Sequence, residues 1–487
     1  MRRQAARATP LVYMLAGEPS GDAIGALLMA ALRREYGAPL RFAGVGGSRM
    51  TSAGLRSLFP MSDLTVMGFA ELVPALPRLA MRLLQTVLAV RADTPHMVVG
   101  IDSKGFNLRV LRHLSSARRS RTHMPSAADD EQPTPILVQY VAPSAWAFAD
   151  ATQRAARLAE TVRLDELLVL LPFEAPLYQS AGIRCTFVGH PALEPEVEGA
   201  QERFTHGDSS PERLPHGGSS SDDVSSTVPP LPPQASSALC LLPGSRPHEI
   251  EANLPLMLQA AELIAVEVAT RFDRSGSSAE LSAQVTPSTG IIDHLLLPVP
   301  LSLRDAVEAH LRARPPGSLR AQVLHDSERH RAYAHSRLAI ACCGTVNVEL
   351  ARARVPQVAV YRSSRLTSWF VRHILRPSTP YATLPNILQG LGQGRVRAAE
   401  GQEGVRRRIP ELLFEACTAE AIAREVVRLL RDPREAQGQV DAASDAVGEL
   451  VTKDEDGRVR SPATVAARAL LRHLPPVNPS VAQRALV

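Results

Sequence analysis

The stretch that most constrains this chain is Ala238-Leu-Cys-Leu-Leu-Pro-Gly-Ser-Arg-Pro-His-Glu249, where an apolar run ends in a glycine turn. The run Ala238–Leu242 predicts a buried parallel strand, and a long helical pattern begins near His248. Backbone N–H groups at the start of a helix have no partner inside it, so here they would face outward and could bind an anion. Arg246 adds a planar cation suited to a diphosphate, although many such turns contain Gly and Ser for geometry alone.

A second turn of this kind follows the apolar run Leu338–Cys342. Cys343-Gly-Thr345 lies where that strand would end, and it opens a helical pattern that carries Glu349. The second half of the chain therefore predicts two glycine turns, each followed by a helix, at the edge of one sheet.

The N-terminal half begins with the same pattern. Leu11–Leu15 predicts the first strand, and Gly17 and Gly21 lie where the backbone would turn and approach a ligand. We expect Ser20 to cap the following helix. The alternative to a ligand site is that Ser20 and Asp22 serve only as helix caps.

Asp102 stands directly after another apolar run, Met97–Ile101. In open α/β sheets ligands bind at the carboxyl ends of the strands, so a carboxylate at this position is well placed for chemistry. The alternative is that Asp102 only caps the following turn. His190 closes this half of the chain, and a ligand contact and a loop histidine held by backbone bonds are equally good interpretations.

Residues 64–84 are densely apolar and are interrupted by Pro74 and Pro77. One interpretation is a buried connecting helix. The other is a lipid-facing surface with arginines at the level of the headgroups. The residues that would face the membrane are Val66, Leu72, Leu76, Arg78 and Arg82. No window of the sequence has the roughly 18 uncharged apolar residues of a membrane span.

Strands alternate with helices in both halves, which predicts two doubly wound α/β domains that face a cleft. Their expected limits are residues 11–195 and 238–433. Residues 200–237, rich in Ser, Pro, Gly and Asp, predict a flexible insertion. Residues 434–487 predict a polar segment, mobile over 437–460, and a C-terminal helix. Two further polar insertions are expected at residues 115–134 and 274–290.

The composition excludes some functions. A net charge of +5 and only 4% aromatic residues do not indicate a nucleic-acid binder. The five cysteines have no metal-ligand spacing and mostly lie in apolar runs, which favours buried thiols in a reducing compartment. Residues 1–9 are rich in Arg and lack acids, as in a transit peptide, but they are too few to decide the matter.

Nine short groups of residues occur in the order found in a known family. They are Ala16–Asp22, Val66–Glu71, Gly100–Asp102 with Phe106-Asn107, Pro143-Ser144 with Trp146, Leu171–Glu174, Val188–His190, Leu242–Arg246, Gly344-Thr345 with Glu349, and Leu384–Asn386. Together they resemble the lipid-A-disaccharide synthases, inverting glycosyltransferases of the GT-B fold with two Rossmann-like domains. Each motif is short, but their ordered combination from about Leu11 to Cys417 is highly specific.

The resemblance implies transfer of 2,3-diacylglucosamine from UDP-2,3-diacylglucosamine to 2,3-diacylglucosamine 1-phosphate, which gives lipid A disaccharide 1-phosphate and UDP. The N-terminal domain would bind the acceptor and lipid, the C-terminal domain would bind the UDP-sugar, and Asp102 would be the catalytic base. The donor-binding residues would be Gly244, Ser245, Arg246, Gly344, Thr345, Glu349 and Asn386. The residues of the acceptor site or cleft would be Gly17, Ser20, Gly21 and Asp22. No cofactor or metal is implied.

Three positions depart from the family pattern. Gly105 replaces a usual second Asp, Cys343 replaces the Ser before the Gly-Thr turn, and Ala149 replaces a basic residue after the Trp motif. The insertions, together with residues 369–372 and 409–417, look more like the plant and algal branch. A mitochondrial address would be expected for that branch, and the cytoplasmic face of the inner membrane for a bacterial protein.

The expected partners are the two lipid substrates and a membrane surface, with no nucleic acid and with a homodimer left open. Two alternatives also stay open. One is a UDP-N-acetylglucosamine 2-epimerase or another UDP-sugar enzyme of this fold, which would not need the apolar stretch. The other is an inactive lipid-binding homologue, which Gly105 and the insertions would suit.

Overall fold

The computed structural model describes residues 9–64, 69–123, 134–194, 237–275, 292–363, 368, 379–392, 408–454 and 456–476. The chain divides into two compact units. Unit 1 contains Met1–Ala200 and Leu450–Val487, and unit 2 contains Gln201–Glu449. Among the described residues no helix combines the length and apolarity needed to cross a bilayer.

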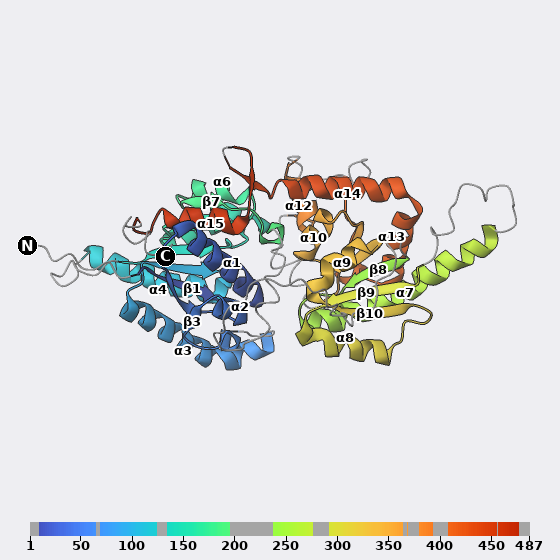
Figure 1. Ribbon diagram of the computed structural model, residues 1–487, viewed down its shortest axis with the longest axis horizontal. Helices are drawn as coiled ribbons and strands as arrows, with labels where there is room; N and C mark the ends of the chain where they lie inside the picture. Colours follow the sequence, from blue (N-terminus) through green and yellow to red (C-terminus); the bar gives the residue numbers. More distant parts are fainter. Residues whose placement is uncertain are drawn as a thin grey trace, which may run out of the picture. The chain divides into compact units, whose positions relative to one another are not determined.

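Unit 1 is built on a parallel sheet with the strand order β3-β2-β1-β4-β5-β6-β7 in its described part (Figure 1). The strands are β1 (Leu11–Ala16), β2 (Arg41–Val45), β3 (Leu55–Ser57), β4 (Met97–Ile101), β5 (Ile136–Tyr140), β6 (Glu166–Val169) and β7 (Cys185–Phe187). The central strands β1 and β4 are apolar and fully buried because helices cover both faces of the sheet. The strand order reverses between β1 and β4, so the carboxyl ends of these two strands form a topological switch point.

Alternate residues of β1 enter two different cores, as the two-residue period of a strand requires. Val12 and Met14 pack against one set of helices, and Tyr13 and Leu15 pack against the other. The first set is α1 (Pro19–Tyr36) and α15 (Pro462–Leu471). The second set is α3 (Phe69–Asp93), α4 (Lys104–His123) and α5 (Ala151–Thr161). The short helices α2 (Ser48–Ser52) and α6 (Glu174–Ser180) complete the unit.

Unit 2 has a second parallel sheet, with the order β10-β9-β8-β11-β12-β13 in its described part. The strands are β8 (Ala238–Leu242), β9 (His294–Val299), β10 (Arg320–His325), β11 (Leu338–Cys342), β12 (Gln357–Tyr361) and β13 (Glu411–Leu413). Its switch point lies between β8 and β11. Two such Rossmann-like sheets confirm the predicted fold class, and the predicted cleft between them stays a prediction.

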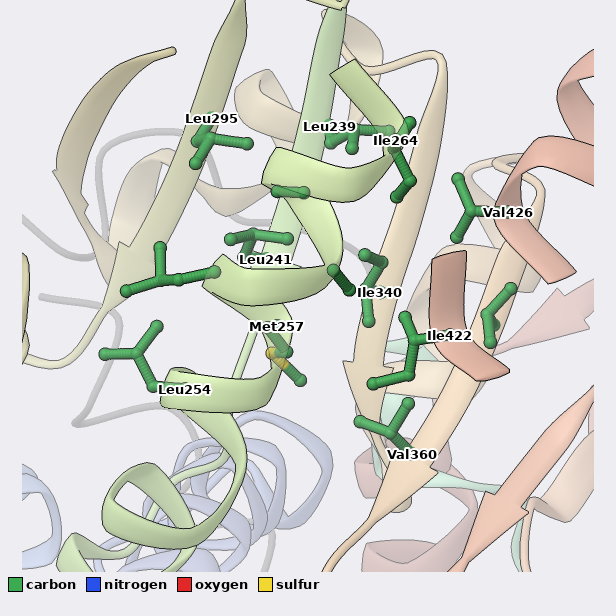
Figure 2. Close-up of a cluster of buried hydrophobic side chains, with 14 of the residues drawn as sticks. Leu239, Leu241, Leu254, Met257, Ile264, Leu295, Ile340, Val360, Ile422 and Val426 are labelled. Atoms are coloured by element: carbon green, nitrogen blue, oxygen red, sulfur yellow. The ribbon is translucent and has the colours of Figure 1, made fainter. Parts of the chain in front are cut away.

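The main core of unit 2 lies between this sheet and two helices, α7 (Pro247–Ser275) and α13 (Ala419–Arg431) (Figure 2). Strand residues such as Leu241 and Ile340 pack against Met257 of α7 and Ile422 of α13. Each fully buried side chain of this kind contributes about 1.5–3 kcal/mol. The other helices are α8 (Leu301–Ala313), α9 (Arg329–Ala334), α10 (Val346–Arg352), α12 (Leu384–Gly392) and α14 (Pro433–Gly448).

The segment 434–487 is divided between the two units. Helix α14 belongs to unit 2, whereas α15 packs on α1 in unit 1. The prediction of a mobile stretch at 437–460 is wrong, because α14 and a short antiparallel pair, β14 (Thr452–Lys453) and β15 (Val459–Arg460), occupy most of it. The polar sequence concealed this because Gln439 is buried, with its amide bonded to the backbone of Gln357.

The predicted insertions fall largely outside the described residues. Residues 195–236 and 276–291 are not described, and neither are residues 124–133. The start of the insertion predicted at 115–134 is helical, since α4 continues to His123. Ser115 of this helix is fully buried and accepts a hydrogen bond from the backbone of Arg163.

Candidate functional site

Asp102 lies at the switch point of unit 1, directly after β4. Its φ angle is 51° and that of Ser103 is 34°, so both residues occupy the left-handed region. Such a conformation costs about 1–3 kcal/mol for each residue with a Cβ atom, and the surroundings must hold it in place. The Asp102 amide donates to the carbonyl of Tyr140 at 2.9 Å, and Oδ2 of its carboxylate accepts a hydrogen bond from Ser20 Oγ at 3.1 Å.

The glycines of the first turn allow this approach. A Cβ atom on Gly17 would lie 2.4 Å from Ser103 Oγ, and one on Gly21 would lie 3.2 Å from the carbonyl oxygen of Ile101. The absence of side chains at these two positions therefore lets the turns after β1 and β4 approach this closely. The prediction that Ser20 caps α1 is wrong, because Glu18 is the N-cap residue. Ser20 lies one residue after Pro19, inside the first turn of the helix.

Asp22 has the capping role that the sequence left open, but it caps a different helix. Its buried carboxylate accepts hydrogen bonds from the backbone of Gly47, Arg49 and Met50 at 2.8–3.0 Å. These N–H groups belong to the start of α2, where a negative charge is favourable. Asp22 thus fixes the loop after β2 and has its oxygens occupied there.

A buried carboxyl group supports Trp146 after strand β5. Trp146 Nε1 donates to Glu174 Oε1 at 3.0 Å, and the Leu171 amide donates to Oε2 at 3.1 Å. Burial raises the pKa of Glu174 to about 7. Nearby, Lys104 Nζ donates to Ser144 Oγ at 2.9 Å. Trp146 and Lys104 are partly exposed at the same edge of the sheet as Asp102.

His190 is a loop histidine held by the backbone. Its Nδ1 accepts a hydrogen bond from the Ala192 amide at 3.2 Å, and burial lowers its pKa to about 4. The structure thus favours the second of the two interpretations of this residue. Within the described part of the chain, no group of three or more His, Cys, Asp and Glu side chains is arranged to hold a metal ion.

The turn after β8 in unit 2 is occupied by a side chain of its own helix. Glu249 Oε2 accepts hydrogen bonds from the amides of Ser245 and Arg246 at 2.8 and 3.2 Å, and Oε1 pairs with Arg246 Nη1 at 3.2 Å. Gly244 has a φ of 130°, and a Cβ atom there would lie 2.5 Å from Glu249. The expectation of free, outward-facing N–H groups is therefore wrong for Ser245 and Arg246, because the Glu249 carboxylate already binds them.

The turn after β11 is more open. Gly344 and Thr345 are exposed at the switch point of unit 2, and a Cβ atom on Gly344 would meet nothing within 4 Å. The Gly344 amide donates to Asn347 Oδ1 at 2.9 Å. The Glu349 carboxylate pairs with Arg329 at 3.3 Å and accepts a hydrogen bond from the Tyr333 hydroxyl at 3.1 Å. It thus binds side chains of the neighbouring helix α9.

Asn386 holds the backbone together. Its Nδ2 donates to the carbonyl of Ile409 and to Glu411 Oε1, both at 2.8 Å, and its Oδ1 accepts from the Ile409 amide at 3.0 Å. Glu411 in turn accepts hydrogen bonds from the amides of Ala382 and Thr383. The amide of Asn386 thus fixes the first turn of α12 to the start of β13, and Glu411 fixes the loop before α12.

Two buried amides at these switch points were not found from the sequence. Gln139 donates to the backbone around Asp102 in unit 1, and Asn253 donates to the carbonyls of Pro243 and Glu249 in unit 2. Asn253 Oδ1 also accepts a hydrogen bond from the Arg362 amide at 2.9 Å. The available signal was a single amide residue inside an otherwise apolar run, as in Ile-Leu-Val-Gln-Tyr140.

Helix α3 has features of both structures predicted for residues 64–84, a buried helix and an exposed apolar surface. Val87 and Val90 are buried in the unit 1 core, while other side chains are more than half exposed. The exposed apolar stripe consists of Leu76, Met81, Leu84 and Leu88. Arg78 is exposed beside it. Val66 and the side chain of Leu72 lie outside the described residues.

Arg82 does not face outward as predicted. Its guanidinium pairs with Asp63 at 2.6 Å and lies 4.7 Å from the centre of the Phe59 ring. These contacts tie α3 to the loop after β3. Arg82 was expected to lie at the level of the lipid headgroups, but its guanidinium instead makes contacts within unit 1.

Comparison with known proteins gives a consistent result. Residues 12–209 and 292–457 match the family described as Lipid-A-disaccharide synthetase. A lipid-A-disaccharide synthase of Rhodospirillum centenum is 36% identical over 89% of this chain and 88% of its own length. A probable mitochondrial lipid-A-disaccharide synthase of Arabidopsis thaliana is 34% identical over 88% of this chain and 81% of its own length. Among solved structures, a UDP-GlcNAc 2-epimerase of Neisseria meningitidis bound to UDP-GlcNAc is similar at a TM-score of 0.48, with 8% identity over 95% of this chain and 98% of that one.

Proposed function

The chain belongs to the lipid-A-disaccharide synthase family, and we propose that it joins two diacylated glucosamines at the sites described above. It is a glycosyltransferase of lipid A biosynthesis, and the family match does not favour the epimerase alternative. The proposed donor is UDP-2,3-diacylglucosamine and the proposed acceptor is 2,3-diacylglucosamine 1-phosphate. The observation that carries the proposal is a carboxylate, Asp102, presented at a switch point by a left-handed turn.

In the proposed reaction the acceptor hydroxyl attacks the anomeric carbon of the donor sugar. The new C–O bond forms as the bond to the diphosphate breaks, and UDP departs with the electron pair. Asp102 accepts the proton of the attacking hydroxyl, a contribution worth roughly 100- to 10,000-fold in rate. The hydrogen bond from Ser20 fixes the direction of the carboxylate.

The leaving diphosphate needs positive charge and fixed donors, which unit 2 would supply. Gly344 and Thr345 offer an open turn at the switch point, and Arg246 offers a cation. Because Glu249 binds the Ser245 and Arg246 amides and pairs with Arg246, we expect the arriving diphosphate to displace this carboxylate from the turn.

The exposed apolar stripe of α3 supports a peripheral association with the membrane that holds both lipid substrates. Burial of four large side chains, with Arg78 near the lipid phosphates, would give reversible and salt-sensitive binding. In a bacterium the membrane bound by this stripe would be the inner membrane, at its cytoplasmic face. In a eukaryote it would be a mitochondrial membrane.

The test is disaccharide formation by the purified protein from UDP-diacylglucosamine and radiolabelled diacylglucosamine 1-phosphate. Product and UDP should appear in equal amounts. Binding of both lipids without product would contradict the proposed reaction.

A further inference from the structure

The carbonyl oxygen of Asp102 is held by two buried side-chain amides. Gln139 Nε2 lies 3.1 Å from it, and Asn107 Nδ2 lies 3.3 Å from it. Both side chains are fully buried. Asn107 also donates to the carbonyls of Leu15 and Ile101 at 3.0 and 2.9 Å, so it joins the ends of β1 and β4.

Gln139 reaches two left-handed turns at once. Besides Asp102, its Nε2 lies 3.2 Å from the carbonyl oxygens of Tyr140 and Val141. Val141 has a φ of 71°, which a β-branched residue rarely adopts. The turns after β4 and β5 are thus bound to the same amide group.

The orientation of this amide follows from its surroundings. Three carbonyl oxygens can only accept hydrogen bonds, so the nitrogen end of Gln139 must face them. Its Oε1 has no hydrogen-bond partner among the described residues. A buried acceptor without a hydrogen-bond partner lowers the stability of the folded state. Stability alone therefore does not account for a glutamine at this position.

The neighbouring strand leaves space for this side chain. Gln139 in β5 is paired in register with Gly100 in β4, and a Cβ atom on Gly100 would lie 2.7 Å from Gln139 Oε1. The Gly100-Ile-Asp102 motif therefore has a glycine at a position where a side chain would press on the Gln139 amide.

We propose that Gln139 is a positioning residue whose amide holds the main chain of Asp102 in the left-handed conformation that aims its carboxylate at the acceptor hydroxyl. The inference rests on the proposed role of Asp102 as the base. A displacement of about 1 Å can lower a rate about 100-fold, so loss of this amide should appear in kcat.

The decisive variant is Gln139→Glu, which keeps the shape of the side chain but reverses its hydrogen bonding. An ionised carboxylate would face three carbonyl oxygens, and burial among them raises its pKa. Only the protonated form can donate a hydrogen bond to Asp102. At pH 8 we expect kcat about 100-fold below wild type, and the ratio of variant to wild-type kcat should rise steadily as the pH is lowered to about 6.

Two further variants show whether the effect is specific. Gln139→Met has a similar volume and no ionisable group, so its kcat should be low at every pH with a constant ratio to wild type. Ser115→Ala removes another fully buried polar side chain of unit 1 and should lower stability without changing the pH profile. UDP affinity, measured by calorimetry, should be unchanged in all three, because the proposed donor turns belong to unit 2.

Wild-type kcat in either folded Gln139 variant would overturn the inference, and so would a Gln139→Glu ratio that does not depend on pH. If Gln139→Glu does not fold, the kcat of Gln139→Met decides alone. Failure of the proposed base is a separate result, since it would be seen as normal turnover in Asp102→Asn. Failure of the proposed reaction would be seen as absence of product from the wild-type protein.

Discussion

The hydroxyl of Ser20 lies 3.1 Å from Oδ2 of Asp102, so the turn after β1 meets the turn after β4. These two strands are neighbours in the sheet although β2 and β3 separate them in sequence. The carboxylate therefore stands at the point of unit 1 where an open α/β sheet binds its ligand.

The first prediction concerns the base. Asp102→Asn keeps the shape and one acceptor oxygen for Ser20, so the fold and UDP affinity should be preserved while turnover falls roughly 100- to 10,000-fold. Disaccharide formation and UDP calorimetry on one preparation measure both quantities. Unchanged turnover would remove the base assignment, and a proportionate loss of donor affinity would make Asp102 a binding residue.

The second prediction concerns the leaving group. Arg246→Ala should weaken UDP binding roughly 10- to 100-fold, because it removes a charged hydrogen-bond donor from the diphosphate. Arg304→Ala is a matched control, since it removes an Arg of unit 2 that pairs with Glu308 on α8. Near-normal UDP affinity in folded Arg246→Ala would mean that Arg246 serves only to pair with Glu249.

Membrane binding is the third prediction. The double variant Leu84→Glu, Leu88→Glu places two charges in the exposed stripe of α3, so sedimentation with anionic vesicles should decrease strongly while thermal stability is nearly unchanged. Val459→Glu, at another exposed apolar residue of unit 1, should bind vesicles like the wild type. Equal sedimentation of the double variant and this control would contradict the proposal, as would wild-type binding that salt does not reduce.

The fourth prediction is a pH dependence of stability. Burial raises the pKa of Glu174 to about 7 in the folded protein, above its ordinary value of 4.5, so between these values the folded state binds more protons than the unfolded state. Stability from this group is therefore fully present below pH 4.5 and is lost as the pH rises through 7, with a total of about 3 kcal/mol at most.

Glu174→Gln should remove this loss. Thermal unfolding of unit 1 should show a midpoint that falls between pH 5 and pH 8 in the wild type and falls less in the variant. Glu160→Gln, at an exposed carboxylate of the same unit, should behave like the wild type. Parallel pH curves for wild type and Glu174→Gln would show that the buried carboxyl does not carry the dependence.

Local sequence predicted the switch points because strand ends and glycine turns are local features. Apolar runs ending at Ile101, Leu242 and Cys342 placed Asp102 and both glycine turns correctly. The partners of the side chains there could not be read in the same way. Glu249 binds the turn at Gly244 through its side-chain rotamer, and the role of Gln139 depends on its register with Gly100 in another strand. Both contacts depend on the tertiary structure, since they form only when the sheets and helices are in place.

Capping was also mispredicted for a physical reason. Ser20 is a better cap residue than Glu18, but Pro19 has a fixed φ and no N–H, which suits the first position of a helix and moves its start forward. Asp22 then faces away from its own helix and binds the start of α2, which is distant in sequence. Cap propensity alone could not show which helix a carboxylate would serve.

The packing of α15 against α1 has a consequence for how this protein is made. Leu28 and Leu32 are buried against Ala466, Ala467 and Leu470, yet the ribosome makes α15 only after all of unit 2. A nascent chain usually folds from its N-terminus, domain by domain, but here the core of the earlier unit is incomplete until α15 has been made. Unit 2, whose residues are contiguous, can fold first, while the apolar face of α1 stays uncovered and open to chaperones until α15 has been made.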